Sequence, residues 1–216
     1  MDEHKGFMER AKKSIIQAHS PDFIVTNLVN FIEELDKISN VVYERLRELY
    51  GLYNPELLEK EMSKEKFISE VKKMEKSEIG YNFNDEDKKF VMKLSKELES
   101  LVVLRNETLS YLDSLAKKEY SNLFDLLGGI LTGRLINSAG SLKELARKSS
   151  STIQIYGAEK ALFRHKKTGA RPPKHGYILQ HSEVMSKPPK ERGKAAKQLA
   201  AKICLVARKD YYGKND

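Results

Sequence analysis

Residues 21–50, PDFIVTNLVNFIEELDKISNVVYERLRELY, decide the fold. Apolar side chains recur along this stretch at intervals that alternate between four and three residues, with one interruption at Arg45. The positions are Ile24, Leu28, Phe31, Leu35, Ile38, Val42 and Leu49. This is the heptad pattern of a helix whose apolar stripe packs against another helix. We therefore predict a long helix here, in a coiled coil.

A second run with the same spacing follows further along the chain. Its apolar positions are Val91, Leu94, Leu98 and Leu101, and they continue with a shift through Leu104, Thr108, Tyr111 and Leu115. Asn84, three residues before Asp87, is a helix start signal. Because about thirty helical residues span roughly 45 Å, the two helices are predicted to form an antiparallel rod. We expect residues 60–76 to extend the first helix, with a turn at 79–82.

The composition changes after Tyr120, where small and apolar residues punctuated by glycines precede several short helical signals. Ser141 and Glu144 form a capping box that predicts a helix over 142–148. Ser151 or Thr152 is expected to open the next helix, which runs to His165. A basic loop over 166–175 and a last helix from Pro188 or Pro189 to about residue 208 follow.

The predicted fold class is all-α, an antiparallel coiled-coil hairpin joined to a compact basic helical domain. We expect three segments: an N-terminal helix or remnant over 1–20, the coiled-coil domain over 21–118, and the basic domain over 119–212. Neither long helix is stable alone, so each must pack on the other or on a second chain.

Charge divides the chain in the same way. Residues 1–115 hold 18 Lys and Arg against 23 Asp and Glu, whereas residues 116–216 hold 21 against 8. Fourteen cations lie between Lys160 and Lys209, opposed only by Glu183 and Glu191. A surface of this kind binds polyanions. Since few aromatic residues are interleaved, we expect a folded RNA or a duplex rather than a long single strand.

Other classes of function find little support in the sequence. The single cysteine, Cys204, excludes an internal disulfide and fits a reducing compartment. No apolar run reaches the roughly 20 residues of a membrane span, so we expect a soluble intracellular protein without a membrane partner. His165, His175 and His181 do not have the spacing of a zinc site, and no paired carboxylates suggest acid–base catalysis. We expect no enzyme activity, no metal and no cofactor.

Several blocks of the sequence resemble the Nop domain family, over roughly residues 20–212. They include Ser151-Thr152-Ile153-Gln154, Gly157-Ala158-Glu159-Lys160-Ala161-Leu162-Phe163-Arg164-His165, Pro172-Pro173-Lys174-His175-Gly176 and Tyr50-Gly51-Leu52-Tyr53-Asn54-Pro55-Glu56-Leu57. The family includes the box C/D ribonucleoprotein core proteins of archaea and the nucleolus and a spliceosomal pre-mRNA-processing factor. The resemblance implies a ribonucleoprotein scaffold.

The resemblance also implies particular contacts. Nop domains recognise a kink-turn RNA that is already bound by a small ribosomal-type protein. The RNA-binding positions carried over are Gly157, Ala158, Lys160, Arg164, His165, Lys166, Lys167, Arg171, Lys174, His175, Lys194 and Lys197. The family's coiled coil pairs with a second copy, which implies a homodimer through Leu28, Phe31, Leu35, Ile38, Val42, Leu94, Leu98 and Leu101.

One departure from the family pattern bears on the partners. Only about twenty residues precede the coiled coil, where methylation-guiding members carry a domain that binds the methyltransferase fibrillarin. Fibrillarin is therefore expected to be a doubtful partner. No long lysine tail follows Asp216, which favours an archaeal, cytoplasmic protein over a nucleolar one. The alternative function is a dimeric coiled-coil adaptor whose basic head docks an acidic protein.

Overall fold

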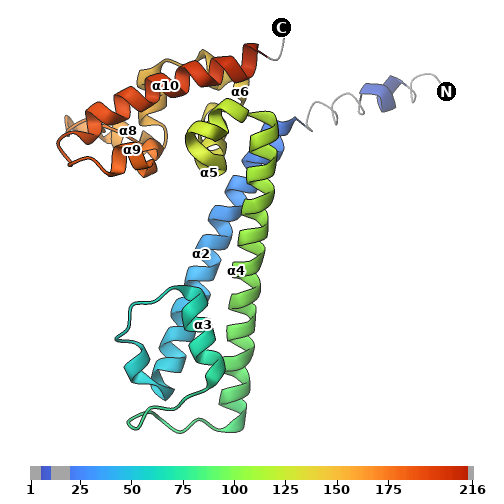
Figure 1. The fold of residues 1–216 in the computed structure, drawn as a ribbon, viewed down its shortest axis with the longest axis vertical. Coiled ribbons are helices and arrows are strands. Elements are labelled where there is room, and N and C mark those ends of the chain that lie inside the picture. Colours follow the sequence, from blue (N-terminus) through green and yellow to red (C-terminus); the bar gives the residue numbers. More distant parts are fainter. Residues whose placement is uncertain (1–5, 11–19, 214–216) are drawn as a thin grey trace. The chain divides into compact units, whose positions relative to one another are not determined.

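The computed structural model describes residues 6–10 and 20–213, and these form helices and loops without a strand among them (Figure 1). The all-α prediction is confirmed. In chain order the larger elements are α2 (Pro21–Tyr53), η1 (Pro55–Leu57), α3 (Lys64–Lys73), α4 (Asp85–Glu119), α5 (Ser121–Ala139), α6 (Leu142–Arg147), α7 (Ser150–Ile155), α8 (Glu159–Thr168), η2 (Tyr177–Gln180), α9 (Ser182–Met185) and α10 (Arg192–Tyr212). Most of the predicted N-terminal helix or remnant over 1–20 lies outside the described residues.

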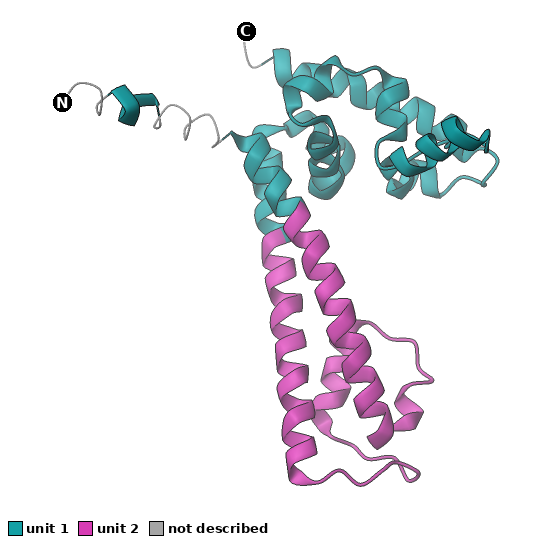
Figure 2. Ribbon diagram, turned by 180° about the vertical axis from the view of Figure 1, so that it is seen from behind, with its two compact units in different colours: residues 1–29, 109–216 teal, residues 30–108 magenta. Residues whose placement is uncertain are grey.

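The chain forms two compact units (Figure 2). Unit 1 comprises residues 1–29 and 109–216, and unit 2 comprises residues 30–108. Both α2 and α4 contribute residues to each unit, so these divisions differ from the domain ranges expected above, 1–20, 21–118 and 119–212. Those ranges remain a prediction.

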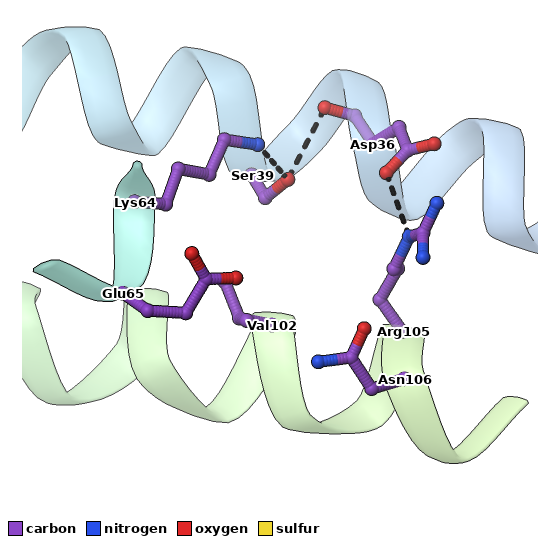
Figure 3. Close-up of a pocket in the computed structure, with 7 residues that line it drawn as sticks. All are labelled: Asp36, Ser39, Lys64, Glu65, Val102, Arg105 and Asn106. Carbon is purple, nitrogen blue, oxygen red and sulfur yellow. Dashed lines mark hydrogen bonds and ion pairs between the residues drawn. The ribbon is translucent and has the colours of Figure 1, made fainter. Parts of the chain in front are cut away.

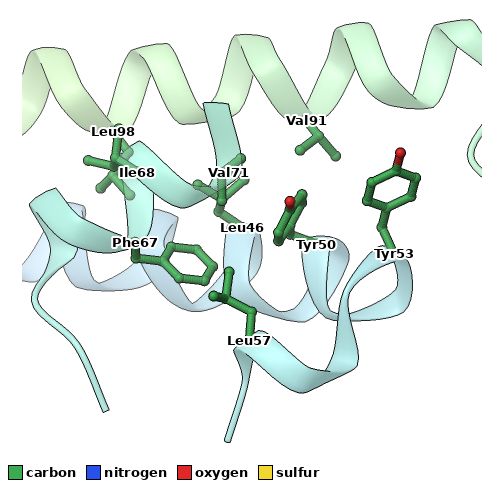
Figure 4. Packing of buried hydrophobic residues seen from close by; sticks show 9 residues of the cluster. All are labelled: Leu46, Tyr50, Tyr53, Leu57, Phe67, Ile68, Val71, Val91 and Leu98. Carbon is green, nitrogen blue, oxygen red and sulfur yellow. The ribbon is translucent and has the colours of Figure 1, made fainter. Parts of the chain in front are cut away.

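The core of unit 2 lies where α3 packs against α2 and α4 (Figure 4). Its buried members are Leu46, Tyr50, Tyr53, Leu57, Phe67, Ile68, Val71, Val91 and Leu98. The Phe67 ring meets Tyr43 edge-on, with ring centroids 5.2 Å apart. Burial of such apolar and aromatic side chains is the main stabilising term in a helical unit of this size.

The expectation that residues 60–76 extend the first helix is wrong. α2 ends at Tyr53, and Asn54 is followed by Pro55, whose ring disfavours a helical conformation in the preceding residue. α3 then starts afresh, with the Ser63 side chain accepting a hydrogen bond from the backbone of Lys66. It lies beside α2 and α4 because Phe67, Ile68 and Val71 would otherwise be exposed. The predicted turn at 79–82 does lie in the loop between α3 and α4.

The buried face of α2 is offset from the predicted stripe. The residues of α2 that are buried are Val25, Val29, Ile32, Leu35, Ser39, Leu46, Tyr50, Gly51 and Tyr53. Of the seven predicted positions only Leu35 is among them, while Phe31 and Ile38 are 40% and 51% exposed. α2 therefore carries two adjacent apolar stripes. One is buried, and the predicted one is divided between Val42 and Leu49, which pack half-buried against the core of unit 2, and Phe31 and Ile38, which are exposed.

In unit 1, α10 packs against α5, α6 and α7. Its residue Asp210 is buried and caps the start of α5, accepting hydrogen bonds from the backbone N–H groups of Asn122 and Leu123 at 3.1 and 2.9 Å. A Cβ on Gly133 would lie 2.3 Å from the Val29 side chain, so α5 and α2 approach closely there. Glycine at this position allows that packing.

The short helices follow the predicted signals with two corrections. The Ser141 hydroxyl accepts from the backbone of Glu144 at 3.1 Å, so the predicted cap is confirmed and α6 follows it. The helix expected from Ser151 or Thr152 to His165 is instead two helices, α7 and α8, because the backbone turns at Gly157 with φ +85°. The last helix begins at Arg192 rather than at Pro188 or Pro189, which lie in the preceding turn.

Candidate nucleic-acid interface

The turn between α7 and α8 has a conformation that its glycine permits. Gly157 lies in the left-handed region, and its N–H donates to the Glu159 carboxylate at 2.8 Å. A Cβ at this position would lie 2.7 Å from the Tyr177 ring, which is itself covered by the Arg134 guanidinium 5.6 Å from its centroid. The Tyr177 ring therefore packs directly against the turn, and the Arg134 guanidinium packs on that ring.

α8 presents a row of cations. Ala158 precedes the helix, and its carbonyl accepts from Leu162 at 3.0 Å. Lys160, Arg164 and Lys167 follow at helical spacing and are exposed, and no residue of α8 is buried. The N–H groups of a helix's first turn attract anions, and cations in its last turn stabilise the opposite end. In α8 the Glu159 carboxylate already lies in the first turn, so the features that favour a polyanion are the exposed cations of this solvent-facing helix.

The loop after α8 is fixed from several sides. Gly169 ends the helix with φ +68°, and the Nδ1 atom of His165 contacts the carbonyl oxygen of Ala170. Further along, the Gly176 N–H donates to the Gln154 carbonyl at 2.9 Å. The Gln154 side-chain amide donates to the carbonyl oxygen of Lys174 at 2.6 Å. Residues 169–176 are therefore tied both to α8 and to α7.

The structure brings most of the predicted RNA-binding residues into this region of unit 1. Eight cations are exposed: Lys160, Arg164, Lys166, Lys167, Arg171, Lys174, Lys194 and Lys197. Within residues 6–10 and 20–213, none of the eight forms an ion pair. Ala158, His165 and His175 are half-buried, and Gly157 is exposed. The charges of the eight cations are consequently available to an external anion.

Some cations of the same stretch are engaged inside the unit. Lys202 pairs with Glu183 at 2.9 Å. The Arg192 side chain donates to the carbonyl of Lys187 at 2.9 Å, and Arg208 donates to that of Ala146 at 3.2 Å. These three side chains hold α9, α10 and α6 together, so charge density along the sequence overstates the number of cations that face a ligand.

Two uncharged residues support the backbone of this surface, and reasoning from charge did not identify them. Gln154 lies within a block of the family resemblance, yet its amide contacts give no signal in composition or spacing. Tyr177 carries no such signal either, although its ring supports Gly157. Only the folded backbone brings Gln154 to Lys174 and Tyr177 to Gly157.

The eight predicted dimerisation residues divide into three groups. Leu35 and Leu98 are buried within the chain itself, at 3% and 0% exposure. Phe31 and Ile38 are exposed, together with Val41, which was not among the predicted residues. Leu28, Val42, Leu94 and Leu101 are half-buried. The exposed apolar side chains are the ones available to a second chain.

Unit 2 contains a small polar cavity of about 110 Å³ between α2, α3 and α4 (Figure 3). Lys64 donates to the Ser39 hydroxyl at 2.7 Å, and Arg105 pairs with Asp36 at 3.1 Å. Burial lowers the pKa of Lys64, while hydrogen bonds from its own backbone and from Ser63 lower the pKa of Glu65. These contacts join the three helices, and the mixture of charges favours neither an anion nor a cation as a ligand.

Metal and membrane chemistry find no site in the parts of the chain that the structure describes. No group of three or more His, Cys, Asp and Glu side chains there is arranged to hold a metal ion. No helix among residues 6–10 and 20–213 is long and apolar enough to cross a bilayer. The expectations of no enzyme activity, no metal and no cofactor remain predictions.

The fold and the exposed cations define an all-helical protein with a strongly basic surface, and comparison with known proteins gives its family. A family model described as "Nop: snoRNA binding domain, fibrillarin" matches residues 58–216. An uncharacterized NOP5 family protein of Methanocaldococcus jannaschii is 35% identical over 97% of this chain and 57% of its own length. Human nucleolar protein 58 is 31% identical over 92% of this chain and 42% of its own length. The chain belongs to the Nop family.

The chain spans about half the length of these relatives. The fold is shared with a chain in the crystal structure of a fibrillarin/Nop5p complex, at a TM-score of 0.58 and 24% identity, covering 98% of this chain and 71% of that one. The expectation that fibrillarin is a doubtful partner gains no support, because that neighbouring structure is a complex with fibrillarin and the family description also names fibrillarin.

Proposed function

We propose that this protein is a non-enzymatic ribonucleoprotein scaffold that binds a kink-turn RNA of the box C/D type together with its small ribosomal-type kink-turn-binding protein. The observation that carries the proposal is a set of eight exposed cations on α8, the following loop and the start of α10, which form no ion pair with any residue that the structure describes. This set lies within the region matched by the snoRNA-binding family model. Cations of this kind bind phosphates and release counterions.

The shape of the surface favours a structured RNA. Phe163 is an exposed aromatic side chain of α8, whereas Tyr177 is occupied beneath Gly157. A platform for single-stranded RNA uses successive stacked rings. The exposed cations of α8 and the fixed loop after it instead suit recognition of backbone geometry at a fixed RNA fold.

The proposed particle contains two copies of the protein. Phe31, Ile38 and Val41 of α2 are exposed, and Val103 and Leu104 of α4 are exposed as well. A coiled-coil helix with a second apolar stripe gains stability by burying it against another helix. We therefore propose self-association through these side chains of unit 2.

Fibrillarin belongs among the partners to be tested, since the neighbouring structure was solved as its complex. The proposed location follows the source of the protein: the cytoplasm of an archaeal cell, or the nucleolus of a eukaryotic one. Human and Arabidopsis relatives carry the word nucleolar in their names.

A gel-shift titration with a kink-turn RNA, with and without the small kink-turn-binding protein and across a salt series, tests the proposal. Binding that tightens strongly when the small protein is present supports composite recognition. Weak binding that ignores the small protein and disappears with salt contradicts it. Binding of an acidic protein without RNA would instead favour the alternative, a dimeric coiled-coil adaptor with a basic head.

A further inference from the structure

Gln154 contacts three backbone groups that lie far from it in the sequence. Its side-chain amide donates to the carbonyl oxygen of Lys174 at 2.6 Å, and the same nitrogen donates to that of Gly193 at 3.4 Å. The backbone carbonyl of Gln154 accepts from the Gly176 N–H at 2.9 Å. One residue of α7 thereby joins the basic loop to the first turn of α10.

These contacts hold the backbone around Lys174 while its side chain stays exposed. The stem of Lys174 runs beside Gly193, since its Cβ and Cδ atoms are 3.5 Å from the position that a Cβ on Gly193 would occupy. The backbone carbonyl and the aliphatic stem of Lys174 are therefore both held in place. Its ammonium group extends from this fixed position. His175 lies between Lys174 and Gly176, two of the three residues that Gln154 contacts.

The chemistry of this junction requires an amide side chain of this length. Two carbonyl oxygens face one side-chain nitrogen, and a primary amide supplies two N–H donors. A carboxylate in its place would face two carbonyl oxygens without a proton to donate. Asparagine is shorter by one methylene group and cannot span the same distance from α7.

We infer that Gln154 is the positioning residue of the RNA surface, fixing the basic loop against α7 and α10 so that Lys174 and His175 meet the RNA in one arrangement. This inference rests on the proposed function. Ordering a loop on binding costs conformational entropy, so a loop that is already fixed binds more tightly with the same contacts. Gln154 itself need not touch the RNA.

The variant Gln154→Met tests this, because methionine keeps the length and volume of the side chain and lacks its N–H donors. Gln198→Met, at an exposed position of α10, is the matched control. We expect Gln154→Met to weaken binding of a kink-turn RNA loaded with its small protein by roughly tenfold. Its thermal unfolding midpoint should stay close to that of the wild type, and Gln198→Met should bind normally.

Double-mutant cycles separate positioning from a general structural effect. In a Lys174→Ala background the loss caused by Gln154→Met should shrink to about twofold, because the side chain that it positions is gone. In a Lys160→Ala background, which changes α8 alone, the loss should stay near tenfold. Hydrogen exchange of the free protein should rise in residues 169–176 and remain unchanged in α4.

Four results overturn the inference. Wild-type affinity in Gln154→Met shows that the junction has no role in binding. An equal loss in the Lys174→Ala and Lys160→Ala backgrounds, or a large fall in the unfolding midpoint, shows a merely structural role. If the wild type itself fails to bind the loaded RNA, the proposed function fails first, and this inference fails with it.

Discussion

Asp22, in the first turn of α2, accepts a hydrogen bond of 3.1 Å from the backbone N–H of Leu142 at the start of α6, 120 residues further along the chain. The other carboxylate oxygen accepts from the Tyr120 hydroxyl at 2.7 Å. Burial and this contact raise the pKa of Tyr120, so the phenol stays protonated and keeps donating. One carboxylate thus connects α2, the α4–α5 junction and α6 within unit 1.

We predict that Asp22→Ala destabilises unit 1. It removes two hydrogen bonds to a charged group and leaves the Leu142 N–H without its cap, which should cost about 2–3 kcal/mol. Urea unfolding followed by circular dichroism measures the change. Tyr120→Phe, which removes only one of the two bonds, should cost less; equal effects would contradict the assignment of the cap.

Tyr50 should make the stability of unit 2 depend on pH in the alkaline range. Burial raises its pKa from 10.0 to about 12, so the folded state favours the protonated phenol. The stabilisation is complete below pH 10 and is lost as the pH rises from 10 to 12. Tyr50→Phe should remove this loss of unfolding free energy between pH 10 and 12, while the ring stays against Phe67. Denaturant unfolding between pH 9 and 12 tests this.

Two glycines with similar backbone angles should differ in their tolerance of alanine. Gly157 and Gly169 have φ of +85° and +68°. A Cβ on Gly157 meets the Tyr177 ring at 2.7 Å, whereas one on Gly169 meets nothing within 4 Å. Gly169→Ala should cost about 1–2 kcal/mol for the left-handed backbone alone, and Gly157→Ala should cost more. Thermal unfolding of the two variants compares them, and similar costs would show that the ring gives way.

Exposed, unpaired cations should matter more for RNA than the paired ones. Lys160→Ala or Arg171→Ala should weaken binding of the loaded kink-turn RNA by about 1–3 kcal/mol if the contact is direct. Lys202→Ala is the control, because Lys202 is paired with Glu183. A filter-binding titration at one salt concentration compares them. Unchanged affinity in both test variants would remove these residues from the interface.

The two apolar stripes of α2 should respond differently to charge. Phe31→Lys with Ile38→Lys should reduce self-association while the helices stay folded, because both side chains are exposed. Leu35→Lys should unfold unit 2, since it buries an unpaired charge at a position that is 3% exposed. Sedimentation equilibrium and circular dichroism separate the outcomes. A double variant that still associates like the wild type would place the interface elsewhere.

The offset of the α2 stripe shows where sequence reasoning reached its limit. Phe31 and Ile32, or Ile38 and Ser39, are neighbours that point about 100° apart on a helix. Both stripes satisfy the heptad spacing well enough, so periodicity established the helix but not its buried face. Packing against α3 and α4 determines which face of α2 is buried, and it buries Ser39 while Ile38 stays exposed.

The break between α7 and α8 has a different cause. Gly157 was visible in the sequence, but glycine also occurs inside helices, so its left-handed backbone could not be read from its identity. The Tyr177 ring, twenty residues later, occupies the space that a side chain would need. The charge count had identified the basic region, but it did not reveal this turn.

The sequence by itself determined the all-helical class, the two long amphipathic helices, the Ser141 cap and the basic character of the region after Lys160, because each depends on local spacing and composition. Only the tertiary structure decided which stripe of α2 is buried, that α3 is a separate helix, and which cations remain free. It also brought Gln154 to Lys174. Those outcomes depend on contacts between segments far apart in the chain, and local pattern carries no information about such contacts.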